Sequence, residues 1–514
     1  MSHSAARKCD ASEPGIILLQ IDGLAYVQFR QALTEGRMPF LQSLIEKRNY
    51  RLEAFYSGLP STTPAVQAEL FFGIPAAVPA IRFLSRGSGE DCLMLNPRRV
   101  KEFAERLSRR QNGLLHNGSS YSNIYAGGAL SARYCLETLE PRNLLKRMRP
   151  LRTLWTLFQH LGKIARIFGL ALVESGLALA DLLQGIRQKE PVFKEIKFVP
   201  TRIWICVVLR EFIRFWVKLD IRNGVPIICA NFVGYDEHAH RRGPDSAFAH
   251  WSLTGIDGVL RDIWHKARKS KRRQYQVLIY SDHGQEAVIP YLTACKRSLS
   301  AGLRNAFMAG PLAGLEISWT EELIGQFYFF KRGRKLLNTL QQSDRESPAG
   351  PGRVVVTALG PLGHIYLPHA LAADEMAAYA QQLVSVGDIP LVLYRPPGKE
   401  VRAINRHGAW QLPEHAVRIL GAGHPCPEEA GSDLIRLVDH QDAGDFVISG
   451  WTPDAAPLTF PMENGAHGGP GSRECHGFLL LPEALAGTHQ GWWRPSVLRK
   501  VVLGCLGRRG DEHV

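Results

Sequence analysis

Short apolar runs separated by helical patterns organise this chain. Residues 15–21 (GIILLQI), 226–233 (PIICANFV) and 275–280 (YQVLIY) are nearly continuous apolar stretches. Runs of this length without alternation are typical of parallel strands that are buried on both faces. Amphipathic helical patterns, such as 38–47 and 247–267, lie between them. The alternation predicts an α/β fold with a mainly parallel central sheet.

An aspartate follows each of these three apolar runs within a few residues. Asp22 follows the first run, Asp236 the second and Asp282 the third. In open α/β sheets the carboxyl ends of parallel strands meet at one edge, where ligands bind. Three acids that are distant in the sequence are therefore expected to lie together at one edge of one sheet.

A second set of α/β patterns occupies residues 301–450. Strands are expected at 353–359, 364–367 and 390–394, with a helix at 373–386. We expect a smaller α/β cap subdomain that folds over the site. The chain would then divide into a core built from residues 1–140, 223–300 and 451–514, a helical insertion at 141–222, and the cap at 301–450.

Positive charge is concentrated in the helical insertion at 141–222. The chain has 514 residues, 45% hydrophobic and 21% charged, as is ordinary for a globular protein, and a net charge of +14. Residues 141–222 hold 16 Lys and Arg against 6 Asp and Glu, so this segment alone contributes +10. Its apolar stretches, 167–183 and 203–217, carry charges and are shorter than the roughly 18 to 20 apolar residues of a bilayer span.

Arg210, Arg214 and Lys218 follow a four-residue spacing and line one face of an expected helix. A basic amphipathic helix suits an anionic membrane surface. A helical cap that packs on the core and turns a basic face to solvent fits the pattern as well. No nucleic-acid-binding motif is evident, and the sequence does not indicate an oligomeric state.

Nine cysteines are irregularly spaced, with no CxxC pair, which argues against a disulfide framework and favours a reducing compartment. The first fifteen residues are polar and lack the apolar core of a secretory signal. The expected location is the cytoplasm, with peripheral contact at the inner face of the membrane as an option for 141–222.

Further metal-ligand residues accompany the acids. Asp236 and His240, in YDEHAHRRGP, are four apart and share one face if the segment is helical, whereas His238 points elsewhere. His283 adjoins Asp282 in YSDHG, and His467 lies in NGAHGG. Carboxylates and neutral imidazoles in similar number suit Zn²⁺, and also Mn²⁺. Two divalent ions about 4 Å apart can assist both attack and departure at a phosphate ester.

A hydroxyl nucleophile is available in LPSTTP, where Pro60 and Pro64 stiffen the chain ahead of a helical pattern. A Thr63 alkoxide at a helix N-terminus would be stabilised by the helix dipole. Taken alone, Ser and Thr at such a position are more often N-caps.

The order of these motifs resembles the alkaline phosphatase superfamily, in particular its type I phosphodiesterase/nucleotide pyrophosphatase branch. That branch has an Asp after the first strand, a Thr nucleophile, and D-x3-H-x2-GP, SDHG and late GxHG elements. The matching positions are Asp22, Thr63, Asp236/His240 with Gly243-Pro244, Ser281-Asp282-His283-Gly284 and Gly465-Ala466-His467-Gly468. The places of Pro60 and Gly73 also match, which selects Thr63 over Ser61 and Thr62. The resemblance covers 15–89, 225–287 and 461–481, and 141–222 has no counterpart in it.

The resemblance implies an alkaline-phosphatase-like α/β/α sandwich and a split of the ligands. Asp22, Thr63, Asp282 and His283 would hold one metal, and Asp236, His240 and His467 the other. The implied activity is a two-metal phosphoric ester hydrolase, a phosphodiesterase or a nucleotide-pyrophosphatase-like enzyme, with a phosphothreonine intermediate. The alternatives are a phosphomonoesterase or phosphotransferase of the same superfamily acting on a lipid head group or envelope intermediate, or a membrane-surface binding protein with a vestigial site.

One departure from the family pattern concerns phosphate binding. The branch usually has an Asn about twenty residues beyond the nucleophile, where this chain has AIRFLS. Arg82, or Asn123 in HNGSSYSNIYAGG, is the candidate to bind a phosphate oxygen instead. The departure weakens an expectation of nucleotide specificity.

Overall fold

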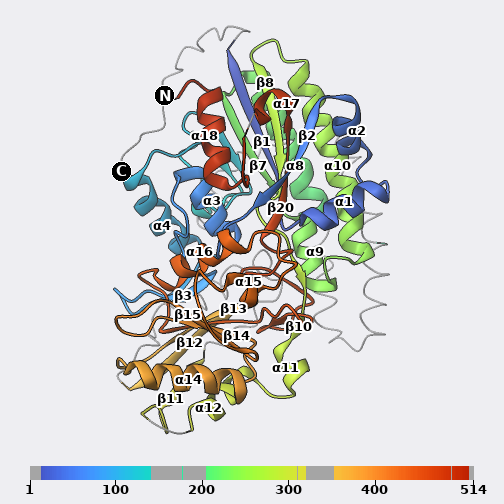
Figure 1. Cartoon of the computed structure of the whole chain (residues 1–514). Coiled ribbons are helices and arrows are strands. Elements are labelled where there is room, and N and C mark those ends of the chain that lie inside the picture. Colours follow the sequence, from blue (N-terminus) through green and yellow to red (C-terminus); the bar gives the residue numbers. More distant parts are fainter. Residues whose placement is uncertain are drawn as a thin grey trace.

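A computed structural model describes residues 13–139, 169, 176, 204–308, 311–319, 352–487 and 489–508. Two seven-stranded sheets lie one beyond the other along the long axis of the molecule (Figure 1). Of the expected insertion at 141–222, residues up to 203 lie outside the described part apart from 169 and 176.

The first sheet has the order β2-β20-β8-β1-β7-β5-β6, and all of its strands run in one direction except β20. The predicted mainly parallel sheet is confirmed. The three apolar runs form adjacent strands in its centre. The strands are β1 (Pro14–Ile21), β2 (Tyr50–Tyr56), β5 (Ser119–Tyr121), β6 (Ser131–Arg133), β7 (Ile227–Phe232), β8 (Gln274–Tyr280) and β20 (His476–Pro482).

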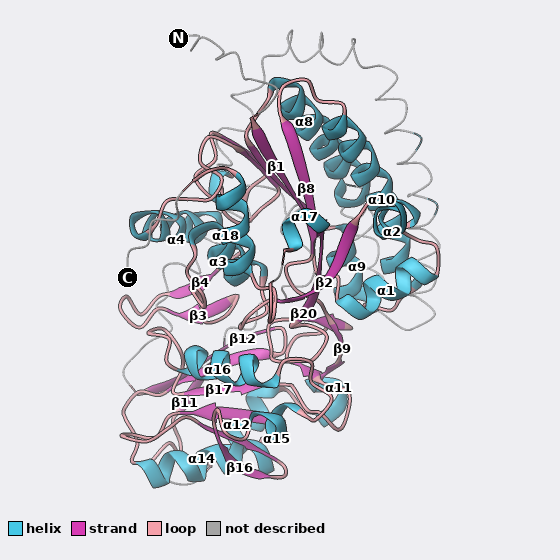
Figure 2. Cartoon of the chain, turned by 45° about the horizontal axis from the view of Figure 1, so that its top comes forward, coloured by secondary structure: helices cyan, strands magenta, loops and turns pink. Residues whose placement is uncertain are grey.

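Helices cover both faces of this sheet (Figures 1 and 2). Ile17 and Leu19 of β1 belong to the apolar core on one face, and Ile16 and Leu18 to the core on the other, because successive side chains of a strand point to opposite faces. One face carries α1 (Tyr26–Thr34), α2 (Pro39–Lys47), α8 (Arg210–Asn223), α9 (Gly234–Arg242) and α10 (Ala247–Arg268). The other carries α3 (Thr63–Phe72), α4 (Pro97–Arg110) and α18 (Pro495–Cys505). The result is the expected three-layer sandwich.

Helix α8 corrects one expectation about the basic insertion. Arg214 is buried, and its guanidinium pairs with Glu211 and, at 2.6 Å, with Asp262 of α10. Arg210 lies directly over Gly255 of the same helix. These two arginines therefore pack against α10, where carboxylates neutralise the charge of Arg214, and they do not form an open basic face.

The second sheet has the order β11-β12-β13-β17-β14-β15-β16, and only β11 and β12 are parallel neighbours. Its strands are β11 (Glu316–Trp319), β12 (Arg353–Leu359), β13 (Leu362–Tyr366), β14 (Leu391–Tyr394), β15 (Arg402–Asn405), β16 (Gly408–Gln411) and β17 (Phe446–Ser449). Helices α12 (Leu299–Ala306) and α14 (Ala373–Ser385) pack on one face, and α15 (Ala416–Leu420) and α16 (Pro427–Val438) on the other.

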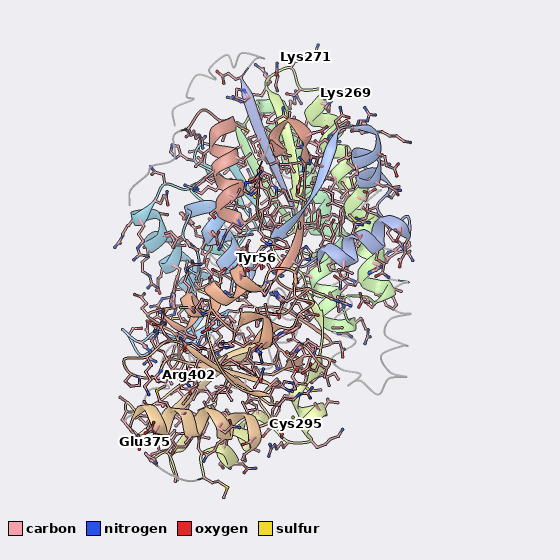
Figure 3. The ribbon with its side chains drawn as sticks, in the orientation of Figure 1. Tyr56, Lys269, Lys271, Cys295, Glu375 and Arg402 are labelled. Atoms are coloured by element: carbon pink, nitrogen blue, oxygen red, sulfur yellow. The ribbon has the colours of Figure 1, made fainter. Side chains whose placement is uncertain are left out.

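The two bodies share an apolar cluster and a polar contact. Tyr56, Leu59 and Cys475 of the first body are buried in the cluster that covers the second sheet. The Tyr56 hydroxyl donates a hydrogen bond to Asp433 of α16 at 2.9 Å. Tyr56 lies midway along the molecule, between Lys271 at one end and Glu375 at the other (Figure 3).

Short elements complete the described chain. They are β3 (Arg82–Leu84), β4 (Asp91–Leu93), the 3-10 turn Leu136–Thr138, the π-helical turn Trp204–Leu209, β9 (Glu286–Ala287), β10 (Ile289–Pro290), α11 (Tyr291–Cys295), β18 (Leu458–Thr459), β19 (Gly465–Ala466) and α17 (Glu483–Ala486). The eight cysteines of the described residues are free thiols. Among the described helices, none combines the length and the hydropathy of a membrane span.

Candidate active site

Strand register brings the candidate residues to one edge of the first sheet. Ile21 at the end of β1 pairs with Phe232 of β7, and Gln20 pairs with Tyr280 at the end of β8. The polar segments that follow these three strands therefore start at the same level. Strand β2 ends at this edge before the segment that leads to α3, and β20 starts there. Five adjacent strands supply the site.

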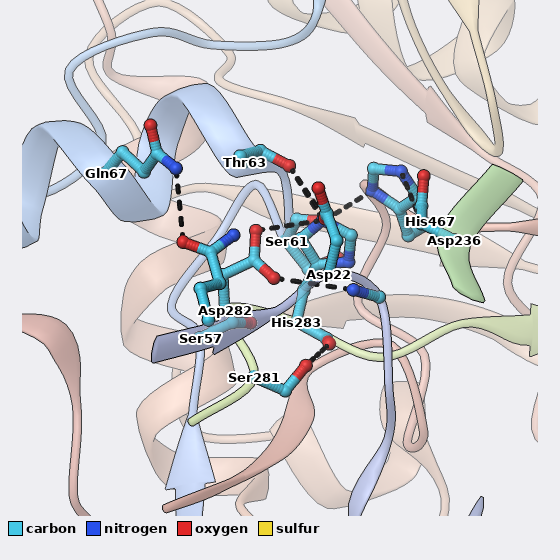
Figure 4. Close-up of polar contacts among 12 residues, drawn as sticks. Asp22, Ser57, Ser61, Thr63, Gln67, Asp236, Ser281, Asp282, His283 and His467 are labelled. Atoms are coloured by element: carbon cyan, nitrogen blue, oxygen red, sulfur yellow. Dashed lines mark hydrogen bonds and ion pairs between the residues drawn. The ribbon is translucent and has the colours of Figure 1, made fainter. Parts of the chain in front are cut away.

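The first group of candidate ligands is tightly packed around the Thr63 hydroxyl (Figure 4). Thr63 Oγ1 lies 3.4 Å from Asp22 Oδ1 and 3.1 Å from His283 Nε2. His283 Nε2 is also 3.4 Å from Asp282 Oδ2 and 3.7 Å from Asp22 Oδ1. The aspartates and the histidine are buried, whereas Thr63 is only half-buried.

The second group adjoins the first. Helix α9 places Asp236 and His240 one turn apart, with Oδ2 and Nε2 at 3.4 Å. His467 Nε2 lies 3.9 Å from Asp236 Oδ1, and its ring stacks on that of His283 with centroids 3.8 Å apart. Ligand atoms of Asp22, Asp282 and His283 lie within 4.8 Å of one another, as do those of Asp236, His283 and His467. His283 thus lies between the two groups, although the resemblance assigned it to the first.

All three histidines are oriented in the same way. The Nδ1–H groups of His240, His283 and His467 donate to the backbone carbonyls of Gly465 (2.9 Å), Gly284 (3.0 Å) and Ser61 (3.0 Å). Each bond fixes the tautomer that leaves a lone pair on Nε2. Each Nε2 faces a carboxylate of the site. The His283 and His467 rings, whose pKa values are lowered by burial, are neutral and ready to bind metal, and His240 is oriented to do the same once it loses the proton that pairs it with Asp236.

The electrostatics of the site show unbalanced negative charge. Burial, with repulsion from Asp236, raises the pKa of Asp282 to about 7, and burial with repulsion from Asp282 and Asp236 raises the pKa of Asp22 well above its usual value. Burial lowers the pKa of His283 to about 4 and, together with His283, lowers that of His467 to about 3. Three carboxylates around neutral imidazoles make a site that favours cations.

Asp236 and His240 behave as a charge pair. Burial acts to raise the pKa of Asp236, but His240 and His467 outweigh it and hold that pKa below its usual value. Burial likewise acts to lower the pKa of His240, and Asp236 reverses this and raises that pKa well above its usual value. Without metal, the half-buried Asp236 and His240 therefore form an ion pair, and a cation bound by both would take the place of the His240 proton.

The donor set fits divalent metal ions. Asp282 Oδ2 is buried and has no hydrogen-bond donor within the described residues. Such an oxygen is costly to bury unless a cation binds it. Carboxylates and imidazoles in equal number are ligands that Zn²⁺ accepts, and they suit Mn²⁺ as well. The residues that would hold two ions are Asp22, Asp282, His283 and Thr63 on one side and Asp236, His240 and His467 on the other.

Thr63 is the hydroxyl that reaches the ligands. Helix α3 begins at Thr63, and Thr62 is its N-cap residue but makes no side-chain cap bond. Ser61 is fully buried and its hydroxyl donates to the Gly469 carbonyl at 2.8 Å. The Thr62 hydroxyl is buried and has no hydrogen-bond partner in the described part of the chain. The N-cap alternative for Thr63 is thus wrong, because the cap position belongs to its neighbour.

The structure places Arg82 and Asn123 in other roles. Arg82 is buried in β3, and its guanidinium forms bidentate hydrogen bonds with Asp91 across the β3–β4 hairpin. Asn123 accepts a hydrogen bond from Gln67 at 3.0 Å and donates to Ser120 at 2.8 Å. A phosphate oxygen would have to displace the carboxylate of Asp91 or break the amide network behind α3. Neither residue belongs to the cluster of ligands.

Three residues near the ligands were not singled out by the sequence. Asn231 Nδ2 donates to Asp22 Oδ2 at 2.7 Å, Gln285 Nε2 donates to Asp236 Oδ1, and Glu463 lies 3.0 Å from His240 Nδ1. The sequence did contain a sign of Asn231's role, because an amide side chain within the apolar run PIICANFV needs a buried hydrogen-bond partner. Gln285 directly follows SDHG, and Glu463 precedes NGAHGG by one residue.

Comparisons with known proteins place the chain beside hydrolases of known structure. It is similar to phosphonoacetate hydrolase from Sinorhizobium meliloti 1021, at 14% identity over 98% of both chains and a TM-score of 0.49. It is also similar to murine ectonucleotide pyrophosphatase/phosphodiesterase 5, at 8% identity over 98% of this chain and 97% of that chain, with a TM-score of 0.49. The human counterpart gives 9% identity, 97% and 96% coverage and a TM-score of 0.47. No family model matches the sequence, and no curated protein matches it.

Proposed function

We propose that the protein is a two-metal-dependent phosphoric ester hydrolase, a phosphodiesterase or nucleotide-pyrophosphatase-like enzyme, with Thr63 as its nucleophile. The supporting observation is the convergence of the Thr63 hydroxyl with three carboxylates and three imidazoles whose Nε2 atoms face inward. Divalent ions bound there would neutralise the phosphate charge and lower the energies of the attacking and departing oxygens.

The reaction begins with attack by Thr63. Its hydroxyl loses a proton, and the N-terminus of α3 stabilises the resulting alkoxide. The oxygen attacks phosphorus in line, the bond from phosphorus to the leaving oxygen breaks, and a phosphothreonine forms. A water molecule then attacks phosphorus from the opposite side, the bond to Thr63 breaks, and the hydroxyl is restored. Solvent accepts the protons that the Thr63 hydroxyl and the attacking water lose, and it protonates the leaving oxygen and the released Thr63 oxygen.

The test uses purified protein loaded with Zn²⁺ or with Mn²⁺. Hydrolysis of bis-p-nitrophenyl phosphate is compared with that of p-nitrophenyl phosphate in wild type and in Thr63→Ala. We expect the diester to be the better substrate and Thr63→Ala to lose activity while the other proposed ligands still bind metal. Higher turnover of the monoester would favour a phosphatase of the same superfamily.

Thr62→Val is the matched control. It removes a neighbouring hydroxyl that has no hydrogen-bond partner among the described residues, so no hydrogen bond is lost, and Val has nearly the shape of Thr. Wild-type rates are expected for this variant. Equal turnover by wild type and Thr63→Ala would exclude Thr63 as the nucleophile.

Peripheral contact with an anionic membrane is a separate proposal that rests on residues 141–203. This part of the insertion has 12 Lys and Arg against 4 Asp and Glu, and it lies almost wholly outside the described residues. Arg210 and Arg214 do not support the contact, because both pack against α10. Flotation of the full chain with anionic liposomes, and with neutral liposomes as control, tests it. Equal binding to both, or to neither, would exclude an electrostatic contact.

A further inference from the structure

A buried hydroxyl and a buried carboxyl lie where three loops of the site meet, and the proposed reaction uses neither. Ser61 is 0% exposed and Glu474 is 1% exposed. Ser61 belongs to the segment that carries Thr63, and Glu474 follows His467 by seven residues. Buried polar groups of this kind are retained only where they are well hydrogen-bonded.

Ser61 joins the loop of the nucleophile to the loop of His467 through three hydrogen bonds. Its carbonyl accepts from His467 Nδ1 at 3.0 Å, and its hydroxyl accepts from the Gly468 amide at 3.0 Å. The same hydroxyl donates to the Gly469 carbonyl at 2.8 Å. Ser61 is two residues from Thr63, so these bonds set the distance between the nucleophile and a ligand more than 400 positions away.

Glu474 completes the connection. Its Oε2 accepts from the Gly469 amide at 2.8 Å and lies 3.3 Å from the Ser61 hydroxyl, and its Oε1 accepts from the Gly471 amide at 2.7 Å. Its backbone carbonyl accepts from the Gly284 amide at 2.9 Å. One residue thus binds the loops of Thr63, His467 and Asp282-His283.

Space around this carboxyl is limited. A Cβ atom on Gly469 would lie 2.9 Å from Glu474 Oε1, and one on Gly471 would lie 2.6 Å from it. Such contacts are shorter than side-chain carbons tolerate, so the turn after His467 must be built from glycines to close around the carboxyl. Gly469 and Gly471 of HGGPG therefore have a structural reason that is independent of backbone flexibility, whereas Gly468 has a φ of +120°.

We infer that Ser61 and Glu474 form a clamp that positions His467 relative to Thr63, and that both are positioning residues of the site. The inference rests on the proposed function in that the clamp would set the spacing between an ion held by His467 and the reacting oxygen. Errors of about 1 Å in such spacing cost rates of about 10²-fold. The hydrogen bond from His467 Nδ1 also fixes the tautomer that leaves Nε2 for the ion.

The test measures metal binding directly, by calorimetric titration of the metal-free protein with Zn²⁺, in Ser61→Ala, Glu474→Gln and the double variant. In Glu474→Gln one of the two acceptor oxygens becomes an amide NH₂. Two donors, this NH₂ and a backbone N–H, then face each other, and that hydrogen bond is lost. We expect one of two ions to bind about 10 to 100-fold more weakly and the other to bind as in wild type. The double variant is expected to be little worse than the weaker single variant, because both changes break one connected unit. For hydrolysis of the diester, kcat should fall while KM stays within a few-fold.

Glu286→Gln is the matched control. Glu286 is a buried carboxylate of β9 that binds the turn of Glu474, but its oxygen accepts from the Arg473 amide at 2.6 Å and from the Ser472 hydroxyl, not from Ser61 or the glycines. It should retain both ions at wild-type affinity. Wild-type affinity for both ions in Glu474→Gln and Ser61→Ala, or an equal loss in Glu286→Gln, would overturn the clamp.

A second measurement separates the clamp from the proposed function. Long-range ¹H–¹⁵N spectra of the metal-free protein report the imidazole tautomers. His467 is expected to carry its proton on Nδ1 in wild type and to gain the Nε2–H form in Ser61→Ala and Glu474→Gln. If wild type binds no metal but this change occurs, the proposed function fails and the clamp stands. If wild type binds two ions and the tautomer does not change, the clamp fails. Circular dichroism of each variant identifies one that does not fold, and the remaining single variant then carries both measurements.

Discussion

Each of the two sheets has seven strands and carries helices on both faces, but the sheets differ in strand direction. In the first sheet all strands except β20 run the same way, and both groups of closely spaced metal-ligand side chains found in the described residues lie at its carboxyl edge. In the second sheet antiparallel neighbours alternate, so the residues that follow successive strands emerge at opposite edges. Parallel strands concentrate the polar ends of distant segments, and antiparallel strands disperse them.

A histidine from each sheet illustrates the difference. His364 of β13 is fully buried and uses both ring nitrogens, since Nε2–H donates to the Pro79 carbonyl at 3.2 Å and Nδ1 accepts from the Gly444 amide at 3.1 Å. His283 commits only Nδ1 to a carbonyl, and its Nε2 faces Asp22, Asp282 and Thr63. The first ring holds the structure together, and the second is available for chemistry.

The largest expected effects come from replacing each of these two histidines, one at a time, with alanine. Loss of an outer partner of a metal ligand typically costs 10 to 100-fold in affinity or activity. His283→Ala removes a proposed direct ligand and should therefore lower kcat/KM by more than about 10²-fold. Metal content measured by mass spectrometry should fall in parallel.

His364→Ala should behave in the opposite way. It leaves a cavity and an unpaired carbonyl and amide, and about 2–4 kcal/mol of unfolding free energy should be lost, as urea titration would measure. Its kcat/KM per folded molecule should be unchanged. Loss of bound metal in His364→Ala would contradict the division of roles between the sheets.

Removal of the proposed ions should also distinguish the two sheets, with a smaller change in the free energy of unfolding. A ligand present at about 100 times its dissociation constant stabilises the folded state by about 2.7 kcal/mol. EDTA should therefore lower the melting temperature, and hydrogen exchange should accelerate at the segments after β1 and β8 while β12–β14 stay protected. Equal acceleration in both sheets would show that the second sheet depends on the ions as well.

Much of this arrangement was predictable from the sequence. Apolar continuity alone predicted the runs that form β1, β7 and β8, and the four-residue spacing of Asp236 and His240 puts both on one face of α9 because that segment is helical. Local patterns of this kind decide whether a segment is a strand or a helix, and the parallel arrangement then decides which ends meet.

What the sequence did not reveal depends on contacts between distant segments. Nothing near Arg82 indicates that Asp91 lies opposite it in a short hairpin, and nothing near Arg214 indicates Asp262 on another helix. The carboxyl of Glu474 lies in a turn whose sequence looks like an ordinary loop. Such partners are set by packing, which periodicity does not encode.

Acid should weaken the second sheet through His364. Burial lowers the pKa of His364 to about 4, whereas an unfolded histidine titrates near 6.5. Between these values the unfolded chain takes up a proton that the folded protein does not, so stability falls as the pH drops through this window and is unaffected above it. The loss contributed by this residue reaches up to about 3 kcal/mol.

The matched variant for this effect is His364→Gln. Its side-chain amide can donate to the Pro79 carbonyl and accept from the Gly444 amide, but it does not titrate. Urea titrations at pH 7 and pH 5 should show a smaller loss of unfolding free energy in His364→Gln than in wild type. The same loss in both proteins would assign the acid sensitivity to other groups.

The smallest effect is expected at the contact between the two bodies. Tyr56→Phe removes the hydrogen bond to Asp433 but leaves the ring in the shared apolar cluster, and Asp433 keeps its pairs with Arg436 and Arg494. The unfolding free energy should therefore fall by only about 1–2 kcal/mol. Tyr394→Phe is the control, because the Tyr394 ring lies within the second sheet and no described residue hydrogen-bonds to its hydroxyl. If Tyr56→Phe shifts the melting temperature no more than Tyr394→Phe does, the apolar cluster alone holds the two bodies together. A change in kcat for the diester would instead mean that the position of the second body affects the site at the edge of the first.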